Sequence, residues 1–200
     1  MTKGVHNTSN LSPSEMAFII DPNRPILTHR RSMQAETNIR HHTHPRGQLL
    51  WAEKGVLSVS GEGTVWVVPS THAMWIPSEI PHQVSSETDT FTRNIYIDPS
   101  YTIREHEKSI VMVTMTPLMQ EVILRLTNHH YKADQARTKH LGLVAIDELE
   151  ALNPFENFIP SGHDPRLQRL IKHMIQRPTQ KTSLPILSSL AGASVRTIER

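Results

Sequence analysis

Short runs of apolar and β-branched residues, separated by glycine and proline, fill the sequence from Ile26 to Ile97. The five clearest runs are Leu49–Ala52, Val56–Val59, Val65–Val68, Ala73–Ile76 and Phe91–Ile97. Many such short runs between turn-forming residues are typical of the strands of a small antiparallel barrel or double-sheet sandwich. We therefore predict a β-barrel over residues 26–115. A polar N-terminal arm over residues 1–25 precedes it, and its first 13 residues are predicted to be disordered or loosely attached.

The periodicity of the sequence changes after residue 115. Residues 117–130 and 133–152 carry apolar side chains at helical spacing, including the stripe formed by Leu118, Val122, Ile123 and Leu126. Amphipathic helices bury such a stripe against another element. The segment 116–152 is therefore predicted to be a connecting helical pair. Its stripe could lie against the barrel or between two copies in a homodimer, and the sequence leaves both open.

The C-terminal residues have the pattern of a helix-turn-helix. After a turn-rich linker over residues 153–163, helices are predicted to begin at Asp164, near Ser183 and at Val195. Gly192 supplies the turn before the last helix and Ser194 can cap that helix. A helix, a glycine turn and a helix that opens with Arg and Thr form an arrangement that places side chains in the DNA major groove. Residues 164–200 are thus predicted to be the start of an all-α domain, which makes the fold class α+β.

The distribution of charge agrees with this division. Residues 1–155 contain fourteen Lys and Arg against sixteen Asp and Glu, whereas residues 156–200 contain seven against three. A basic tail on a nearly neutral body is expected of a nucleic-acid-binding unit. The absence of cysteine excludes disulfides and thiolate metal sites. Neither a signal peptide nor an apolar run of membrane-spanning length is found, so we expect a cytoplasmic protein without a membrane partner.

Histidines are concentrated in the barrel region. His42 and His44 are two residues apart and would face the same side of a strand, Gln48 follows them, and His82 stands on a later strand. Such a set can converge as a site for a divalent transition metal, either Zn, Ni or Fe. The alternative is that these side chains are the polar lining of a metal-free ligand pocket, because the neutral Gln48 does not balance the charge of a cation.

Three further residues are candidates for contact with an effector. Arg46 lies between the histidines and Gln48 and could hold an anionic group through two hydrogen bonds, although an exposed turn arginine is more common. Trp51 and Trp75 could wall a pocket, although core packing is the more frequent role of strand tryptophans.

Three segments resemble parts of two known families. HHTHPRGQLLWAEKG and WVVPSTHAMWIPSEIPH are similar to the two motifs of the cupin barrel, and His42, His44 and His82 fall on its metal-binding histidines. Gln48 falls where metal-binding cupins usually have Glu. The stretch from Asp164 to Arg200 resembles the start of the DNA-binding domain of AraC/XylS-type transcriptional regulators, with Ser194, Arg196, Thr197, Ile198 and Arg200 on the family's S-x-R-T-[LI]-x-R signature.

The resemblance implies a transcriptional regulator rather than an enzyme. A cupin-like domain would sense a small effector, the helical pair would form a homodimer, and the C-terminal unit would bind promoter DNA through Ser194, Arg196, Thr197 and Arg200. The family has two helix-turn-helix units and only the start of the first is present here. We therefore expect these 200 residues to bind DNA weakly and without sequence preference.

Two other functions remain open at this point. A metal-dependent cupin enzyme, either a dioxygenase or an isomerase, would use the same three histidines and Gln48 but would leave the basic tail without a role. A metal-binding storage or sensor module without DNA would likewise explain only the barrel.

Overall fold

The computed structural model describes residues 10–128, 135–155, 159–160, 166, 169–170, 173–174 and 181–198. Its strands are β1 (Asn10–Leu11), β2 (Ile26–Met33), β3 (Asn38–His42), β4 (Gly47–Lys54), β5 (Leu57–Gly61), β6 (Thr64–Val68), β7 (His72–Ile76), β8 (His82–Ser86), β9 (Thr90–Ile97), β10 (Val111–Thr114) and β11 (Ile159–Pro160). Its helices are the 3-10 turn η1 (Glu15–Phe18), α1 (Pro117–Thr127), α2 (Gln135–Ala151), α4 (Leu184–Ala191) and α5 (Val195–Ile198). None of these helices is long and apolar enough to span a lipid bilayer.

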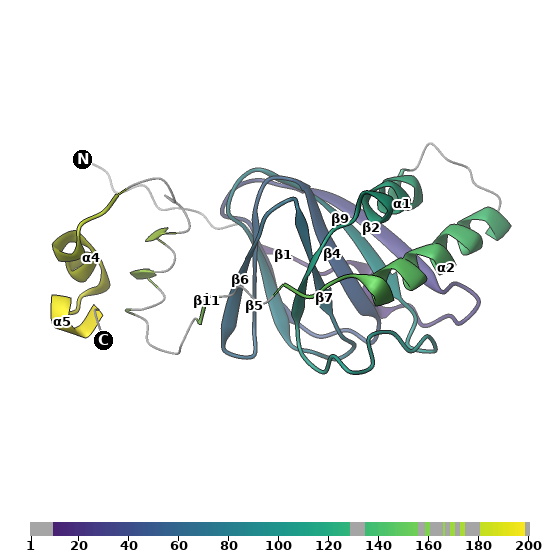
Figure 1. The fold of residues 1–200 in the computed structure, drawn as a ribbon, viewed down its shortest axis with the longest axis horizontal. Helices are drawn as coiled ribbons and strands as arrows, with labels where there is room; N and C mark the ends of the chain where they lie inside the picture. Colours follow the sequence, from purple (N-terminus) through teal and green to yellow (C-terminus); the bar gives the residue numbers. More distant parts are fainter. Residues whose placement is uncertain are drawn as a thin grey trace.

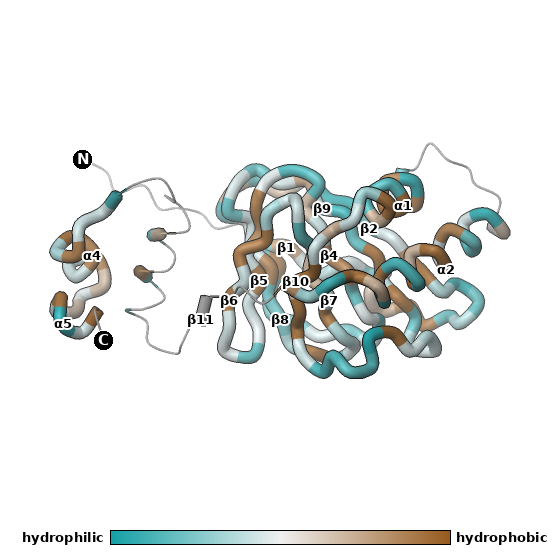
Figure 2. The backbone as a smooth tube through the Cα atoms, viewed as in Figure 1, coloured by the Kyte–Doolittle hydropathy of each residue, from teal (hydrophilic) through white to brown (hydrophobic). Residues whose placement is uncertain are grey.

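Two facing sheets form the predicted β-barrel. In the part of the chain that is described, one sheet has the strand order β1-β3-β8-β5-β6-β11 and the other has the order β10-β7-β4-β9-β2 (Figure 1). All five predicted strand runs are confirmed, as β4, β5, β6, β7 and β9. The space between the sheets is filled by one apolar cluster, which includes Leu50, Val59, Trp66, Met74 and Val84. Figure 2 shows the alternation of apolar and polar stretches along the chain.

A second apolar core lies between the β10-β7-β4-β9-β2 sheet and the two helices α1 and α2. Val122 and Ile123 of α1 and Ala145 and Leu149 of α2 are buried there against the outer face of that sheet. The apolar stripe of α1 is therefore buried within the monomer, which resolves the alternative that the sequence left open. The stripe is narrower than predicted, since Leu118 is 52 % exposed.

The two helices begin and end where local chemistry requires. Thr116 caps α1, since its side chain accepts a hydrogen bond of 3.1 Å from the amide of Met119, and Pro117 occupies the first turn. At the other end of the pair, the buried guanidinium of Arg104 donates to the carbonyls of Leu149 and Leu152, at 3.0 and 2.7 Å. These carbonyls lie at the C-terminal end of α2, where the helix itself supplies no donors.

The arm preceding the barrel is ordered over its described residues, which corrects the prediction for residues 10–13. β1 pairs in parallel with β3, and the guanidinium of Arg31 donates to the carbonyl of Ser12 at 2.9 Å. Ala17 of η1 is fully buried. Backbone pairing and burial, which no local polarity pattern reveals, hold this segment on the barrel.

The linker and the C-terminal residues are described in part. Phe155 donates its amide to the carbonyl of Met112 on β10 at 2.7 Å, and β11 pairs with β6, so residues 153–155 and 159–160 of the linker are extended as predicted. α4 ends at Gly192, whose φ of 68° is left-handed, and Ser194 accepts from the amide of Thr197 at 3.2 Å at the start of α5. These two helices and their turn match the prediction. Most of the helix predicted from Asp164 lies outside the described residues.

Candidate functional site

Three histidine side chains meet at one end of the barrel. His42 is the last residue of β3 and pairs in register with His82, the first residue of β8. His44 lies in the connection between β3 and β4, so the prediction that it shares a strand with His42 is wrong. One ring nitrogen of each histidine lies within 4.8 Å of those of the other two. The cluster predicted from spacing therefore forms, although a chain turn brings His44 in rather than strand alternation.

The backbone fixes the orientation of each ring. The Nδ1 atoms of His42, His44 and His82 lie 2.7, 2.6 and 2.8 Å from the carbonyl oxygens of residues 40, 46 and 80. A carbonyl can only accept, so each Nδ1 carries the proton and donates it. A ring that is protonated only at Nδ1 presents Nε2 with its lone pair, and Nε2 of His82 is buried without a hydrogen-bond partner among the described residues. Rings held by such outer hydrogen bonds are typical of metal ligands.

Gln48, the second residue of β4, completes the cluster. Its Oε1 lies 2.9 Å from Nε2 of His44, and its Nε2 donates to Oδ1 of Asn94 at 2.7 Å. Oε1 of Gln48 can only accept, so this contact is a hydrogen bond where Nε2 of His44 carries a proton and a pair of ligand atoms where both bind one cation. Tetrahedral ligand atoms bound to one Zn²⁺ at about 2.0–2.1 Å are themselves about 3.3–3.4 Å apart, so binding one ion through both atoms requires Gln48 and His44 to move slightly apart.

Burial keeps two of the rings uncharged. It lowers the pKa of His82 to about 3, and the neighbouring His42 and His44 lower it further, whereas the carbonyl of Ile80 opposes the shift. Burial also lowers the pKa of His42. A neutral imidazole is the form that binds metals. These two rings are therefore in the ligand-competent form at neutral pH.

The structure gives Arg46 a role within the fold, and its contact with an effector stays a prediction. Its side chain is completely buried and pairs with Asp98 at 3.0 Å. The remaining donors of its guanidinium go to backbone carbonyls of Ile19, Asp21, Arg24, Pro25 and Tyr96. With every nitrogen bound to the protein, Arg46 fastens the segment before β2 to the end of β9.

Trp51 and Trp75 have the core position that the sequence analysis gave as the more frequent one, and Trp75 also lines a cavity of about 390 Å³, so contact of these rings with an effector stays a prediction. Both rings pack in the core beneath α1 and α2, on the opposite face of the sheet from the histidine cluster. Alternation along β4 explains this result, because Gln48 and Leu50 point into the barrel and the odd-numbered Leu49 and Trp51 point to the helices. The sequence alone could not show which face of β4 points into the barrel and which points toward the helices.

The interior of the barrel next to the histidines is almost filled. A cavity of about 20 Å³ remains there, lined by residues that include His42, Gln48, Asn94 and Tyr96. This volume is close to the space one water molecule needs. Asn94 and Tyr96 were missed by sequence reasoning. Their signal was a polar and an aromatic residue at alternate positions of the apolar strand β9, on the face shared with Gln48.

The residues predicted to contact DNA are located only in part. Ser194 caps α5, its Oγ lies 2.8 Å from Oγ1 of Thr197, and Arg196 stands on the first turn of α5. Arg200 lies outside the described residues. The predicted positions of these residues around a short helix agree with the structure, and their role in DNA binding stays a prediction.

A two-sheet barrel with clustered histidines at one end and a helical layer on one face is the architecture of a cupin-like domain. The sequence profile described as "AraC-like ligand binding domain" matches residues 25–190. This chain therefore belongs to the AraC-like ligand-binding family, which confirms the resemblance inferred from the sequence.

Individual relatives agree with this assignment. The chain is 25 % identical over 160 residues to "HTH-type transcriptional regulator NimR" of Escherichia coli strain K12, an alignment that covers 80 % of this chain and 58 % of NimR. The chain thus spans a little over half the length of that curated relative. The crystal structure of the AraC-like transcriptional activator CuxR superimposes with a TM-score of 0.52 at 9 % identity, over 88 % of this chain and 69 % of CuxR. CuxR supports the fold alone. A structure of ToxT from Vibrio cholerae covers 88 % of this chain and 74 % of its own, at 10 % identity and a TM-score of 0.48.

Proposed function

We propose that this chain is the sensing part of a DNA-binding transcriptional regulator, in which a cupin-like domain responds to a small effector. The single observation that carries the proposal is the family match over residues 25–190, most of the described chain. The same match favours a regulator over the metal-dependent cupin enzyme, because AraC-type regulators are not enzymes even though some enzymes share the fold. The location in the cytoplasm follows as an expectation from this function.

The histidine cluster binds one divalent transition metal, Zn, Ni or Fe, in this proposal. His42, His44 and His82 supply nitrogen ligands and Gln48 supplies an oxygen. Support comes from the buried Nε2 of His82, which has no hydrogen-bond partner among the described residues, and from the ring nitrogens of the three histidines, which lie within 4.8 Å of one another. A bound ion supplies a positive Lewis-acidic centre at the barrel end. The protein's own residues hold the rings in place through the carbonyls of residues 40, 46 and 80.

The metal proposal is tested by elemental analysis of protein purified without a histidine tag. We expect a first-row metal at close to one equivalent, and its loss in His44→Ala and in His82→Ala. His41→Ala is the matched control, since His41 is an exposed neighbour outside the cluster. Circular dichroism verifies that the variants remain folded. A wild-type protein that contains no metal and does not take up zinc or nickel would leave the cluster as the polar lining of a purely organic pocket.

DNA binding is assigned to the C-terminal helices in this proposal. α4, the turn at Gly192 and α5 have the order of a helix-turn-helix, with Arg196 and Thr197 on the helix that would enter the major groove. The description of NimR as an HTH-type regulator supports the assignment by relationship. Arg200, as the last residue of the signature, belongs to the same proposed contact surface.

A homodimer is part of the proposal because two-fold symmetry brings two DNA-binding units onto paired half-sites. The face available for it is smaller than the sequence implied. Val122 and Ile123 pack on the barrel, and the exposed apolar residues of the helical pair are Leu118, Leu143 and Val144. Light scattering on the wild type and on Val144→Glu tests this interface: a wild type that stays monomeric at high concentration would exclude it.

A further inference from the structure

Space for an organic effector exists outside the barrel. The cavity beside the histidines holds about 20 Å³, whereas a groove along the free edge of β2 has a volume of about 660 Å³. Pockets for drug-sized ligands have roughly 300–1,000 Å³. In this conformation the groove can hold an organic molecule, and the small cavity beside the histidines cannot.

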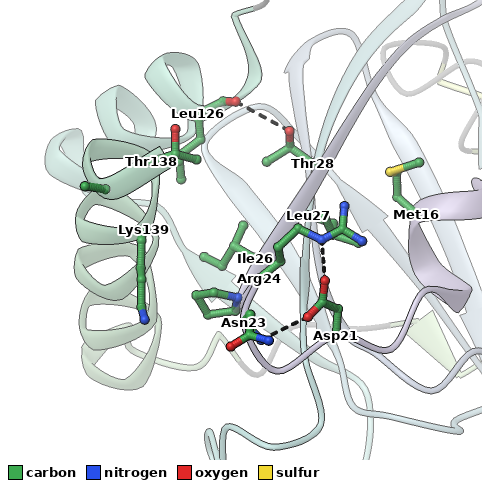
Figure 3. Close-up of a pocket in the computed structure, with 12 residues that line it drawn as sticks. Met16, Asp21, Asn23, Arg24, Ile26, Leu27, Thr28, Leu126, Thr138 and Lys139 are labelled. Carbon is green, nitrogen blue, oxygen red and sulfur yellow. Dashed lines mark hydrogen bonds and ion pairs between the residues drawn. The ribbon is translucent and has the colours of Figure 1, made fainter. Parts of the chain in front are cut away.

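The groove lies where the edge strand β2 meets both helices of the helical pair. β2 is at the end of its sheet, paired with β9 on one side and with no described strand on the other. In Figure 3, Lys139 and Thr138 of α2 lie across the groove from Ile26, with Leu126 of α1 above. We call this the β2–α2 groove. Its described lining is Met16, Asp21, Asn23, Arg24, Pro25, Ile26, Leu27, Thr28, Leu126, Ala136, Thr138 and Lys139.

The lining combines apolar walls with an excess of positive charge. Ile26 and Leu126 supply much of the apolar surface. Of the three charged side chains, Asp21 is already paired with Arg24, whose Nε lies 2.7 Å from its Oδ2. Lys139 is left as the charge in excess, and the hydroxyl of Thr138 stands one residue away. An apolar site with one net cation is complementary to an apolar molecule that carries one negative group.

From these observations we propose that the β2–α2 groove binds the effector, and that this effector is an amphipathic monoanion such as a medium-chain carboxylate. Lys139 contacts the anionic group, and the apolar body lies against Ile26 and Leu126. The inference rests on the proposed sensing function and names the place and chemical class of the molecule sensed. It leaves the histidine cluster as a separate metal site.

The position of the groove beside α2 also explains how effector binding reaches the C-terminal helices. Ile26 forms the wall of the groove and at the same time supports α2, because a Cβ on Gly142 would lie only 3.5 Å from Cδ1 of Ile26. Thr28 joins β2 to the end of α1 by donating to the carbonyl of Leu126 at 3.4 Å. A ligand that displaces Ile26 therefore shifts α2, which leads directly into the linker before the C-terminal helices. Effector binding changes an equilibrium only through such contacts that differ between two arrangements.

Calorimetric titration with decanoate, and with the uncharged decanamide, tests the proposal on the whole chain. Lys139→Gln should weaken decanoate about tenfold, the size expected for one charge-assisted hydrogen bond, and should leave decanamide unchanged. Ala136→Trp, which fills the groove from an exposed position of α2, should weaken both ligands at least as much. Lys54→Gln and Ala151→Trp make the same chemical changes outside the groove and should bind like the wild type.

The titrations are repeated on protein loaded with one equivalent of zinc. Equal decanoate affinity with and without zinc supports two separate sites. Decanoate affinity that is the same in Lys139→Gln as in Lys54→Gln overturns the proposal, as does the absence of decanoate binding. Binding that depends on zinc and not on Lys139 would also overturn it, by placing the organic ligand at the histidine cluster, and would leave the proposed regulatory function standing.

Discussion

Replacing Arg46 should lower the free energy of unfolding of this protein, because Arg46 connects three segments at the end of the barrel. Its guanidinium is fully buried and binds the Asp98 carboxylate together with the carbonyls of Ile19, Asp21, Arg24, Pro25 and Tyr96. Arg46→Met keeps most of the side-chain volume but removes all of these donors. Arg46→Lys keeps the charge and loses the planar fork that reaches several carbonyls at once.

The size of the effect follows from what the substitution leaves behind. Removing one partner of a buried ion pair costs about 3–5 kcal/mol, mainly because the other charge stays buried without its partner. Arg46→Met should therefore lower the free energy of unfolding by about 4 kcal/mol, and Arg46→Lys by roughly half of this. With a urea dependence of about 2 kcal/mol per molar, the first variant should unfold at a urea concentration lower by about 2 M.

Urea unfolding followed by tryptophan fluorescence measures this shift, and a double-mutant cycle with Asp98→Asn isolates the ion pair. The double variant should lose less unfolding free energy than the two single variants lose together, because it no longer contains the buried carboxylate that Arg46→Met leaves without a partner. An Arg46→Met variant with the urea midpoint of the wild type and a lost response to effector would refute this reasoning. Arg46 would then be the effector-binding residue that the sequence suggested.

The same pair gives a dependence on pH with a defined sign. Burial by itself raises the pKa of Asp98, but hydrogen bonds from Ser100 and the amide of Asp21, with the charge of Arg46, outweigh it and hold this pKa below 3.8. The unfolded chain therefore takes up a proton at a higher pH than the folded chain does. The stabilisation is present above about pH 4 and is lost as the pH falls through the pKa of the folded state, so Asp98→Asn should flatten the acid limb of a stability–pH profile.

Three other substitutions give further checks. Gly47→Ala should destabilise the fold by about 1–3 kcal/mol in urea unfolding, because its Cβ would lie 2.3 Å from Cη2 of Trp75. Gly142→Ala should destabilise the fold much less, because its Cβ would lie 3.5 Å from the nearest side-chain atom. Gln48→Glu should raise zinc affinity about tenfold or more in a competition titration, since a carboxylate adds negative charge beside the cation; an unchanged affinity would remove Gln48 from the ligand set. Arg196→Ala should weaken binding of duplex DNA in fluorescence anisotropy and reduce its dependence on salt concentration, and an unaltered salt dependence would exclude a phosphate contact.

Local chemistry explains why much of the fold could be predicted. Strands β4 to β7 and β9 follow from apolar runs between glycine and proline, and α1 begins where Thr116 and Pro117 cap it. The turn at Gly192 also follows from its own residue type. Each of these features depends on neighbours in the sequence. The long strand β2 and the strand-like N-terminal segment lacked such a signal, since their pairing partners are distant in the sequence.

The same distinction applies to the candidate site, where residue types could be predicted from the sequence and their arrangement in space could not. Because imidazole chemistry is a property of the residue, the sequence could name His42, His44 and His82 as a cluster of candidate metal ligands. It could not show that His44 enters from a turn, or that the carbonyls of residues 40, 46 and 80 fix the rings. Asn94 went unnoticed because its hydrogen bond to Gln48 joins residues 46 positions apart.

The sequence by itself determined which residues bend the chain, which segments are strands or helices, and which side chains have the chemistry of a ligand. The tertiary structure alone decided which face of each strand is the interior. That decision placed Trp51 and Trp75 under the helices, used every donor of Arg46 within the fold, and put an open groove beside β2 rather than inside the barrel. The physical reason is that propensity and capping act between near neighbours, whereas burial and the satisfaction of buried polar groups depend on elements that meet only in three dimensions.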